Sequence, residues 1–282
     1  MSVAEEIREQ QKQALSTMSF KDKLAYFWDY YKIHTLVAVC LVIVAVSVIH
    51  QLVTNKDYAL YATIINTGTA GYEDETAAKW AAEFGEYAQI DTDKYQVLID
   101  ATMVLTESPD SQIRIANQQK MAAMMQTGTI SAQIAETETF EEYAQFECYY
   151  ALEDVLSAEQ IEKYRPYFYY TDAATFEQDD AASYAASGQD ETAASADMAA
   201  QTDPSTLVID HRDPSTMEQP VAVGIIITDS KMIKDSDYYK YLDSPEYDYQ
   251  GYPSDVILGI PLSNKEPEIA IRFLEFLKVT ED

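Results

Sequence analysis

The residues best suited to chemistry are six tyrosines near the C-terminus of a chain that holds 22 tyrosines in 282 residues. A tyrosine ring offers a flat apolar face and a polar tip. Carbohydrate sites use such rings to stack on the sugar, beside carboxylates that accept its hydroxyl protons. We therefore predict a site for a sugar, a peptide or an envelope polymer at Tyr238, Tyr239, Tyr241, Tyr247, Tyr249 and Tyr252. The alternative is that these rings pack under a loop or cover a sheet edge.

Catalytic groupings are sparse in this chain. The sequence holds no Gly-x-Ser-x-Gly, no glycine-rich phosphate loop, no His-Glu-x-x-His and no Cys-x-x-Cys. His211-Arg212-Asp213 copies three letters of the kinase catalytic loop, but Pro214 follows and the metal-binding Asn is missing. Cys148 has no candidate general base nearby in sequence, so we expect an inert thiol. We predict no catalytic residue and no enzyme.

Charge narrows the classes of partner. The net charge is −29, and a short acidic cluster, Asp235, Asp237, Asp243 and Asp248, could hold Ca²⁺. The spacing of that cluster fits no known calcium loop, so we expect neither a metal nor another cofactor. Nucleic acid is excluded, because a protein needs basic residues to neutralise phosphates.

The elements that must position the tyrosines alternate between strand and helix. Strand-like runs cover residues 57–66, 94–105, 129–135, 206–210, 220–228 and 256–261. Helical spacing covers residues 74–88, a helix that starts at Ser108-Pro109-Asp110 and runs to about Gln126 before Gly128 stops it, residues 137–144, a short helix to Tyr164 opened by a capping box at residues 157–160, a helix from Asp229 or Ser230 to Leu242, and a last helix capped by Asn264. This alternation predicts a layered α/β domain with a mostly parallel sheet. Residues 172–204 are rich in Ala, Ser, Asp and Gln, and we interpret them as a disordered acidic insertion.

The N-terminal part predicts a membrane anchor. Residues 34–53 are almost wholly apolar and, as a helix, cover roughly 30 Å, the thickness of the hydrocarbon core. Residues 19–33 before them form a predicted amphipathic juxtamembrane helix, and residues 1–18 a cytoplasmic tail. An aromatic collar at the headgroup level consists of Tyr26, Phe27, Trp28, Tyr30 and Tyr31. A cleaved signal peptide is the alternative, but the leader is 33 residues long and the only small-x-small site lies inside the apolar run.

The orientation follows from the basic residues. Five basic residues precede the predicted span, whereas only Lys56 lies within the 20 residues after it, which places the N-terminus in the cytoplasm. Six of the 19 basic and five of the 48 acidic residues lie in residues 1–56, so residues 57–282 carry a net charge of −30 outside the cell. With a single cysteine outside and no Asn-x-Ser/Thr acceptor, we expect the plasma membrane of a bacterium.

Two resemblances follow from these segments. The string at residues 23–32, with its Tyr-Phe-Trp core, resembles the anchor region of uncharacterised single-span proteins of Gram-positive bacteria. Residues 118–156, in which a helix ending at Gly128 leads to a strand, a helix and an acidic Asp-Val-Leu turn, resemble extracellular solute-binding proteins of the type II periplasmic-binding fold. Residues 258–277 resemble a later strand and helix of the same proteins. This resemblance implies a periplasmic-binding-protein-like ectodomain.

We therefore expect a membrane-anchored extracellular binding protein similar to solute-binding proteins. The alternative is a cell-envelope scaffold that uses the same fold without a small-molecule ligand. A hydrolase is a distant third hypothesis, which two carboxylates facing each other in a cleft would support.

Overall fold

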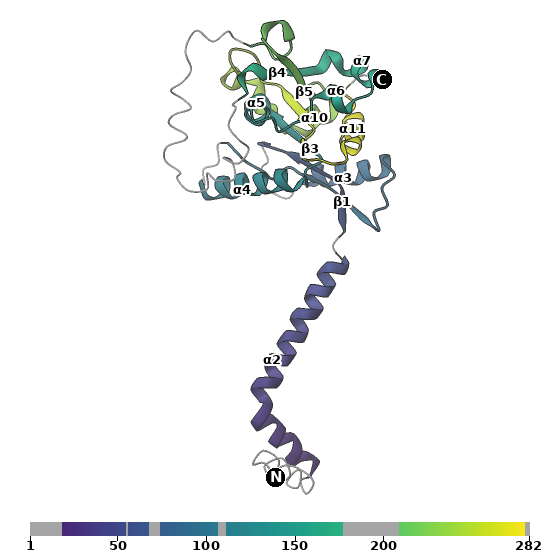
Figure 1. Ribbon diagram of the computed structural model, residues 1–282, viewed down its shortest axis with the longest axis vertical. Helices are drawn as coiled ribbons and strands as arrows, with labels where there is room; N and C mark the ends of the chain where they lie inside the picture. The colour runs from purple at the N-terminus through teal and green to yellow at the C-terminus, as the bar shows by residue number, and fades with distance from the viewer. Residues whose placement is uncertain (1–18, 55, 68–73, 107–110, 177–208, 280–282) are drawn as a thin grey trace. The chain divides into compact units, whose positions relative to one another are not determined.

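The computed structural model describes residues 19–54, 56–67, 74–106, 111–176 and 209–279 (Figure 1). It divides into two compact units, Met1–Lys56 and Asp57–Asp282. The expected tail, residues 1–18, lies outside the described residues. So does the insertion from residue 177 onward. Its expected start at 172 is too early, because Asp172 is buried at the end of a strand and Ala173–Thr175 form a 3₁₀ turn.

The N-terminal unit contains one long helix, α2 (Phe20–Thr54), so the juxtamembrane segment and the predicted span are continuous. Its window Lys32–Ile49 has a mean hydropathy of 2.4 and is long and apolar enough to cross a membrane. No other helix among the described residues passes that test. Phe27 and Trp28 of the expected collar are exposed, whereas the side chains of Tyr26, Tyr30 and Tyr31 lie outside the description.

The C-terminal unit is built on a six-stranded sheet in the order β2-β1-β3-β6-β5-β4. The strands are β1 (Asp57–Ile64), β2 (Tyr95–Asp100), β3 (Ala132–Glu136), β4 (Phe168–Asp172), β5 (Pro220–Ile226) and β6 (Val256–Gly259). Pairs β1–β2 and β1–β3 are parallel, whereas β3–β6, β5–β6 and β4–β5 are antiparallel. The expected α/β architecture is confirmed, but the prediction of a mostly parallel sheet is wrong, because the sheet is mixed.

The connection between β5 and β6 explains why the sheet is mixed and not mostly parallel. A parallel pair needs a crossover, usually a helix that spans the sheet. The helix expected from Asp229 or Ser230 to Leu242 is instead the short α10 (Lys231–Ser236), which ends at Asp237 with φ 58°. The chain then returns to the edge it left, where the backbone N–H of Val256 donates to Thr228 Oγ1 at 2.8 Å. The strand β6 therefore enters antiparallel to both of its neighbours.

Helices cover both faces of the sheet. They are α3 (Glu75–Tyr87), α4 (Ser111–Thr127), α5 (Thr137–Gln145), α6 (Leu152–Val155), α7 (Ala158–Tyr164) and α11 (Pro267–Phe276). Local capping confirms several predicted boundaries, including the capping box at Ser157 and the positive φ of Gly128 after α4. Asn264 is not the cap of α11, since Glu266 holds that position and Pro267 begins the helix. Residues 209 and 210 form no strand, and 206–208 lie outside the description.

The core has two parts, one on each face, because successive side chains of a strand point to opposite faces. Leu60, Ala62 and Ile64 of β1 join one cluster with side chains of α3 and α11. Ile65 joins the other cluster, with Met121 of α4 and residues of α5. In that second cluster the rings of Phe140 and Tyr149 stack with centroids 4.4 Å apart.

We expect Gly259→Ala to destabilise the C-terminal unit, because a Cβ there would meet Phe140 Cε2 and Tyr149 Cδ1 at 2.7 Å. Overpacking of this kind costs roughly 1–3 kcal/mol. Gly85→Ala is the control, since a Cβ in α3 would meet only ordinary contacts at 3.8 Å and removes a helical glycine. That change should stabilise by about 0.5–1 kcal/mol. We would measure the midpoint temperature of unfolding by circular dichroism on the full chain in detergent. The midpoint should fall for Gly259→Ala and rise for Gly85→Ala. If both midpoints shift in the same direction, the packing described here is contradicted.

Candidate functional site

The structure separates the six predicted tyrosines into two groups. Tyr238 and Tyr239 are buried, with 1% and 6% of their surface exposed, and Tyr241 is half-buried. The hydroxyl of Tyr239 donates to the carbonyl of Ile65 at 2.7 Å, and that of Tyr241 to the carbonyl of Asn66 at 3.0 Å. The rings of Tyr239 and Tyr241 therefore cover the carboxyl end of β1, whereas Tyr238 packs edge to face on Trp80 of α3 with ring centroids 5.6 Å apart.

The place they cover is where an open α/β sheet usually binds a ligand. The strands β2 and β3 lie on opposite sides of β1, and the crevice at the carboxyl ends of such strands is the common ligand position. Here the crevice holds a buried polar network. The Asn66 amide donates to Glu136 Oε1 at 2.8 Å and to Thr139 Oγ1 at 3.0 Å, and its oxygen accepts from the backbone N–H of Leu105 at 2.8 Å.

Glu136 is the charged member of this network. Burial raises the pKa of its carboxyl group, against the lowering effect of hydrogen bonds from Thr139 and Asn66. Its Oε2 is buried and has no hydrogen-bond partner among the described residues. The buried carboxyl group of Glu136 in this crevice is therefore easier to protonate than an exposed carboxyl group.

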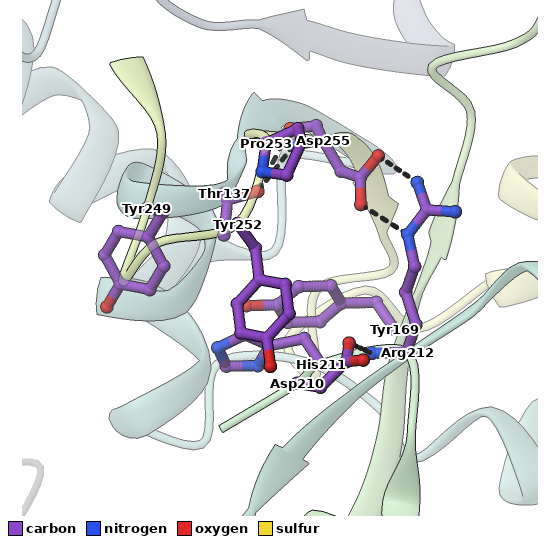
Figure 2. A pocket seen from close by; sticks show the side chains of 9 residues that line it. All are labelled: Thr137, Tyr169, Asp210, His211, Arg212, Tyr249, Tyr252, Pro253 and Asp255. Atoms are coloured by element: carbon purple, nitrogen blue, oxygen red, sulfur yellow. Dashed lines mark hydrogen bonds and ion pairs between the residues drawn. The ribbon is translucent and has the colours of Figure 1, made fainter. Parts of the chain in front are cut away.

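The second group of tyrosines belongs to a hollow of about 340 Å³ (Figure 2). Tyr249 and Tyr252 lie at the two ends of a tight hairpin, where their backbones exchange hydrogen bonds of 2.8 and 3.0 Å. The two residues between them, Gln250 and Gly251, have φ of 50° and 87°, as a type I′ turn requires. The hollow is lined by Thr137, Tyr169, Asp210, His211, Arg212, Tyr249, Tyr252, Pro253 and Asp255. Tyr247 does not line it and packs edge to face on Tyr241 at 5.0 Å.

A bidentate ion pair forms one wall of the hollow. Figure 2 shows the guanidinium of Arg212 facing both carboxylate oxygens of Asp255, with Nε 2.9 Å from Oδ2. Thr228 Oγ1 donates to Oδ1 of the same carboxylate at 2.9 Å, and the backbone N–H of Asp255 donates to Thr137 Oγ1 at 2.8 Å. The carboxylate is thus held in one orientation by Arg212 and Thr228, while Thr137 fixes the backbone of the same residue. Such fixed charges can orient a polar ligand.

His211 forms the floor. Its ring stacks on Tyr169 with centroids 4.6 Å apart, and Nδ1 lies 2.8 Å from the carbonyl oxygen of Tyr170. Because a carbonyl oxygen only accepts, Nδ1 carries a hydrogen. Nε2 is buried without a partner among the described residues. Behind the ring, Oε2 of Glu141 lies 3.7 Å from Nδ1, and burial raises the pKa of Glu141 while His211 lowers it.

The sequence predicts only some of the residues that line this hollow. Tyr249 and Tyr252 were predicted, whereas Tyr169, Arg212 and Asp255 were not. In the sequence, His211 and Arg212 match only part of a kinase motif. The signal in the sequence is the repeat of Asp-Pro-Ser-Thr at residues 203–206 and 213–216, on either side of them, a composition typical of turns. Cys148 is half-buried, and burial raises the pKa of its thiol to about 11, as expected for an unreactive group. Within the described ranges no three metal-ligating side chains gather.

Neither a protein-family model, nor a curated protein, nor a solved structure matches the chain. The two resemblances stated from the sequence remain predictions. The geometry of the hollow is therefore the main basis for a functional proposal.

We expect stability to depend on pH through Glu136. Its folded pKa is raised, so the folded state holds more protons than the unfolded state above the ordinary pKa of 4.5, and stability falls as pH rises through that window. Glu136→Gln removes the charge, keeps an oxygen for Asn66 and Thr139, and should gain thermal stability relative to wild type between pH 4.5 and 7.5. The exposed Glu162→Gln is the control and should track wild type. The measurement is the midpoint temperature of unfolding as a function of pH. If the midpoints of Glu136→Gln and wild type run parallel across this pH range, a raised pKa of Glu136 is contradicted.

Proposed function

We propose that this chain is a single-span protein of a bacterial plasma membrane, with a cytoplasmic N-terminus and an extracellular unit, Asp57–Asp282, that binds a ligand in the hollow. The ligand class is a sugar ring, a short peptide or a segment of an envelope polymer. The protein acts by binding and not by catalysis. The hollow is the single observation that carries this proposal.

The long helix α2 supports the anchor. Its apolar side chains from Leu36 to Ile49 are exposed on all sides, and none of its window Lys32–Ile49 is buried against protein. Such a surface is unfavourable in water and favourable in lipid, at roughly 25 cal/mol for each Å² removed from water. The excess of basic residues before the span supports the orientation.

The composition of the hollow supports the ligand class. Its volume, about 340 Å³, lies within the range of small-molecule sites. Tyr252 is 41% exposed and Tyr249 half-buried, so both rings have a free surface on which a sugar or a side chain can stack. Asp255 and Arg212 supply a fixed acceptor and a fixed donor. The charge of −30 on residues 57–282 disfavours an anionic ligand.

The resemblance to solute-binding proteins enters the same proposal at the level of architecture. The order helix, Gly128, strand and helix expected from it is present as α4, β3 and α5. The proposed ligand position differs from the crevice beside β1, because Tyr239 and Tyr241 fill that crevice. A filled crevice is also what favours the alternative, an envelope scaffold without a small-molecule ligand.

A ligand screen tests the choice between these two functions. The full chain in detergent is heated with a panel of sugars, short peptides and soluble cell-wall fragments, and a true ligand raises the midpoint of unfolding. We expect Tyr252→Ala to reduce the affinity for that ligand at least about tenfold, which is about 1.4 kcal/mol of binding free energy, and so to reduce the shift in midpoint. Tyr247→Ala is the matched control, since Tyr247 is equally exposed, at 39%, but does not line the hollow. No shift with any compound, or equal losses in both variants, contradicts a ligand in the hollow and favours the scaffold.

Cysteine labelling tests the orientation. In a chain with Cys40 and Cys148 replaced, Lys79→Cys places a thiol on an exposed position of α3 and Ser2→Cys places one in the N-terminal segment. A membrane-impermeant maleimide should label residue 79 on intact cells and residue 2 only after lysis. The reverse pattern contradicts the proposed topology, and labelling of both on intact cells contradicts a retained span.

A further inference from the structure

Aromatic rings border the hollow on several sides (Figure 2). The rings of Tyr169 and His211 stack, and the ring of Tyr249 lies 6.0 Å from that of His211, centroid to centroid, at an angle of 41°. The hairpin that carries Tyr249 also carries Tyr252. Tyr169 is buried, so the faces that a ligand can reach are those of Tyr249 and Tyr252. Such electron-rich faces attract a cation placed within about 6 Å of the ring centre.

Carboxylates outnumber cations at the wall that Arg212 forms. The hydrogen bond from Arg212 to Asp255 raises the pKa of the guanidinium, against the lowering effect of burial, and the charges of Asp229 and Asp210 raise it further. One guanidinium therefore faces three carboxylates, and its bidentate ion pair engages only that of Asp255. Asp210 lines the hollow, where its Oδ1 accepts from the backbone N–H of Arg212 at 2.9 Å. A negative charge is left unbalanced at this wall.

The side of the hollow near Tyr249 is acidic as well. Burial raises the pKa of the Tyr249 hydroxyl, and the carboxylates of Glu141, Glu138 and Glu142 raise it further. Glu138 and Glu142 are one turn apart on α5, and Glu141 lies behind the ring of His211. Carboxylates on two sides of a hollow create a field that concentrates positive charge and repels negative charge. The hollow therefore favours a cationic group.

His211 supplies an acceptor for the hydrogens of such a group. The residue is 9% exposed, and its Nε2 has no hydrogen-bond partner among the described residues. A positive charge beside the ring disfavours a second proton on it, and a ring whose single proton is on Nδ1 presents Nε2 as an acceptor. An ammonium group that carries N–H donors thus satisfies a buried atom that the described side chains leave unpaired. A quaternary ammonium group has no hydrogen to donate.

We infer that the hollow recognises a primary ammonium group, as carried by an amino sugar or a lysine side chain. The rings of Tyr249 and Tyr252 contact its charge, and the carboxylate of Asp210 and Nε2 of His211 accept its hydrogens. The inference rests on the proposed function and narrows its ligand class, because a sugar or a peptide without an amine lacks the group that the hollow selects.

Matched amines and amides test the role of the charge. A glucosamine trimer and its N-acetylated form differ only in the acetyl groups that remove the charge. A terminally capped tripeptide with a central lysine and its Nε-acetyl form differ in the same way. Titration calorimetry on the full chain in a nonionic detergent should show one charged form binding at least about tenfold more tightly than its acetylated form, because charge-assisted hydrogen bonds are lost. The Nε-trimethyl peptide should bind more weakly than the primary amine.

Two variants separate recognition in the hollow from diffuse attraction to an acidic protein. Tyr252→Leu removes a ring face and keeps an apolar side chain, and Asp210→Asn removes a charge and keeps Oδ1 for the N–H of Arg212. Each should weaken binding of the charged probe roughly two- to fivefold. The matched controls, Tyr247→Leu and the exposed Glu162→Gln, should leave it unchanged. Equal losses in variants and controls assign the binding to diffuse charge and overturn the inference.

The remaining outcomes distinguish this inference from the proposed function. If an acetylated or other uncharged compound binds as tightly as the amine and loses affinity in Tyr252→Leu, the choice of a primary ammonium group is overturned and ligand binding in the hollow stands. If neither these probes nor any compound of the sugar, peptide and cell-wall panel binds, both fail together.

Discussion

The side chain of Asn66 holds together the edge of the sheet on which the rest of the C-terminal unit depends. With φ at 56° it turns the chain sharply after β1, and its amide joins β1 to the residues after β2, to the end of β3 and to the first turn of α5. These bonds are buried, so losing one leaves an unpaired polar group at a penalty of about 1–3 kcal/mol. The network and the rings of Tyr239 and Tyr241 close the crevice beside β1. The hollow near β4 and β6 is separate from this crevice.

Local interactions are what the sequence predicts well. The capping box at Ser157 and the stop at Gly128 each act within a few residues, and the structure confirms them. The direction of β6 depends on a contact between Val256 and Thr228, 28 residues apart, and on the early end of α10 at Asp237. Neither is visible in the periodicity of the sequence. The alternation of strand and helix therefore predicted the layers correctly and the sheet direction wrongly.

The candidate site shows the same division. Six tyrosines of identical type were predicted as one surface, yet Tyr238 is 1% exposed and Tyr252 is 41% exposed. The left-handed residue Asp237 turns the chain so that Tyr238 and Tyr239 enter the core, while the Gln250-Gly251 turn projects Tyr249 and Tyr252 outward. His211 and Arg212 reach the hollow from a segment that pairs with Tyr170 on the free edge of β4. A pattern of residue types carries no information about such a pairing.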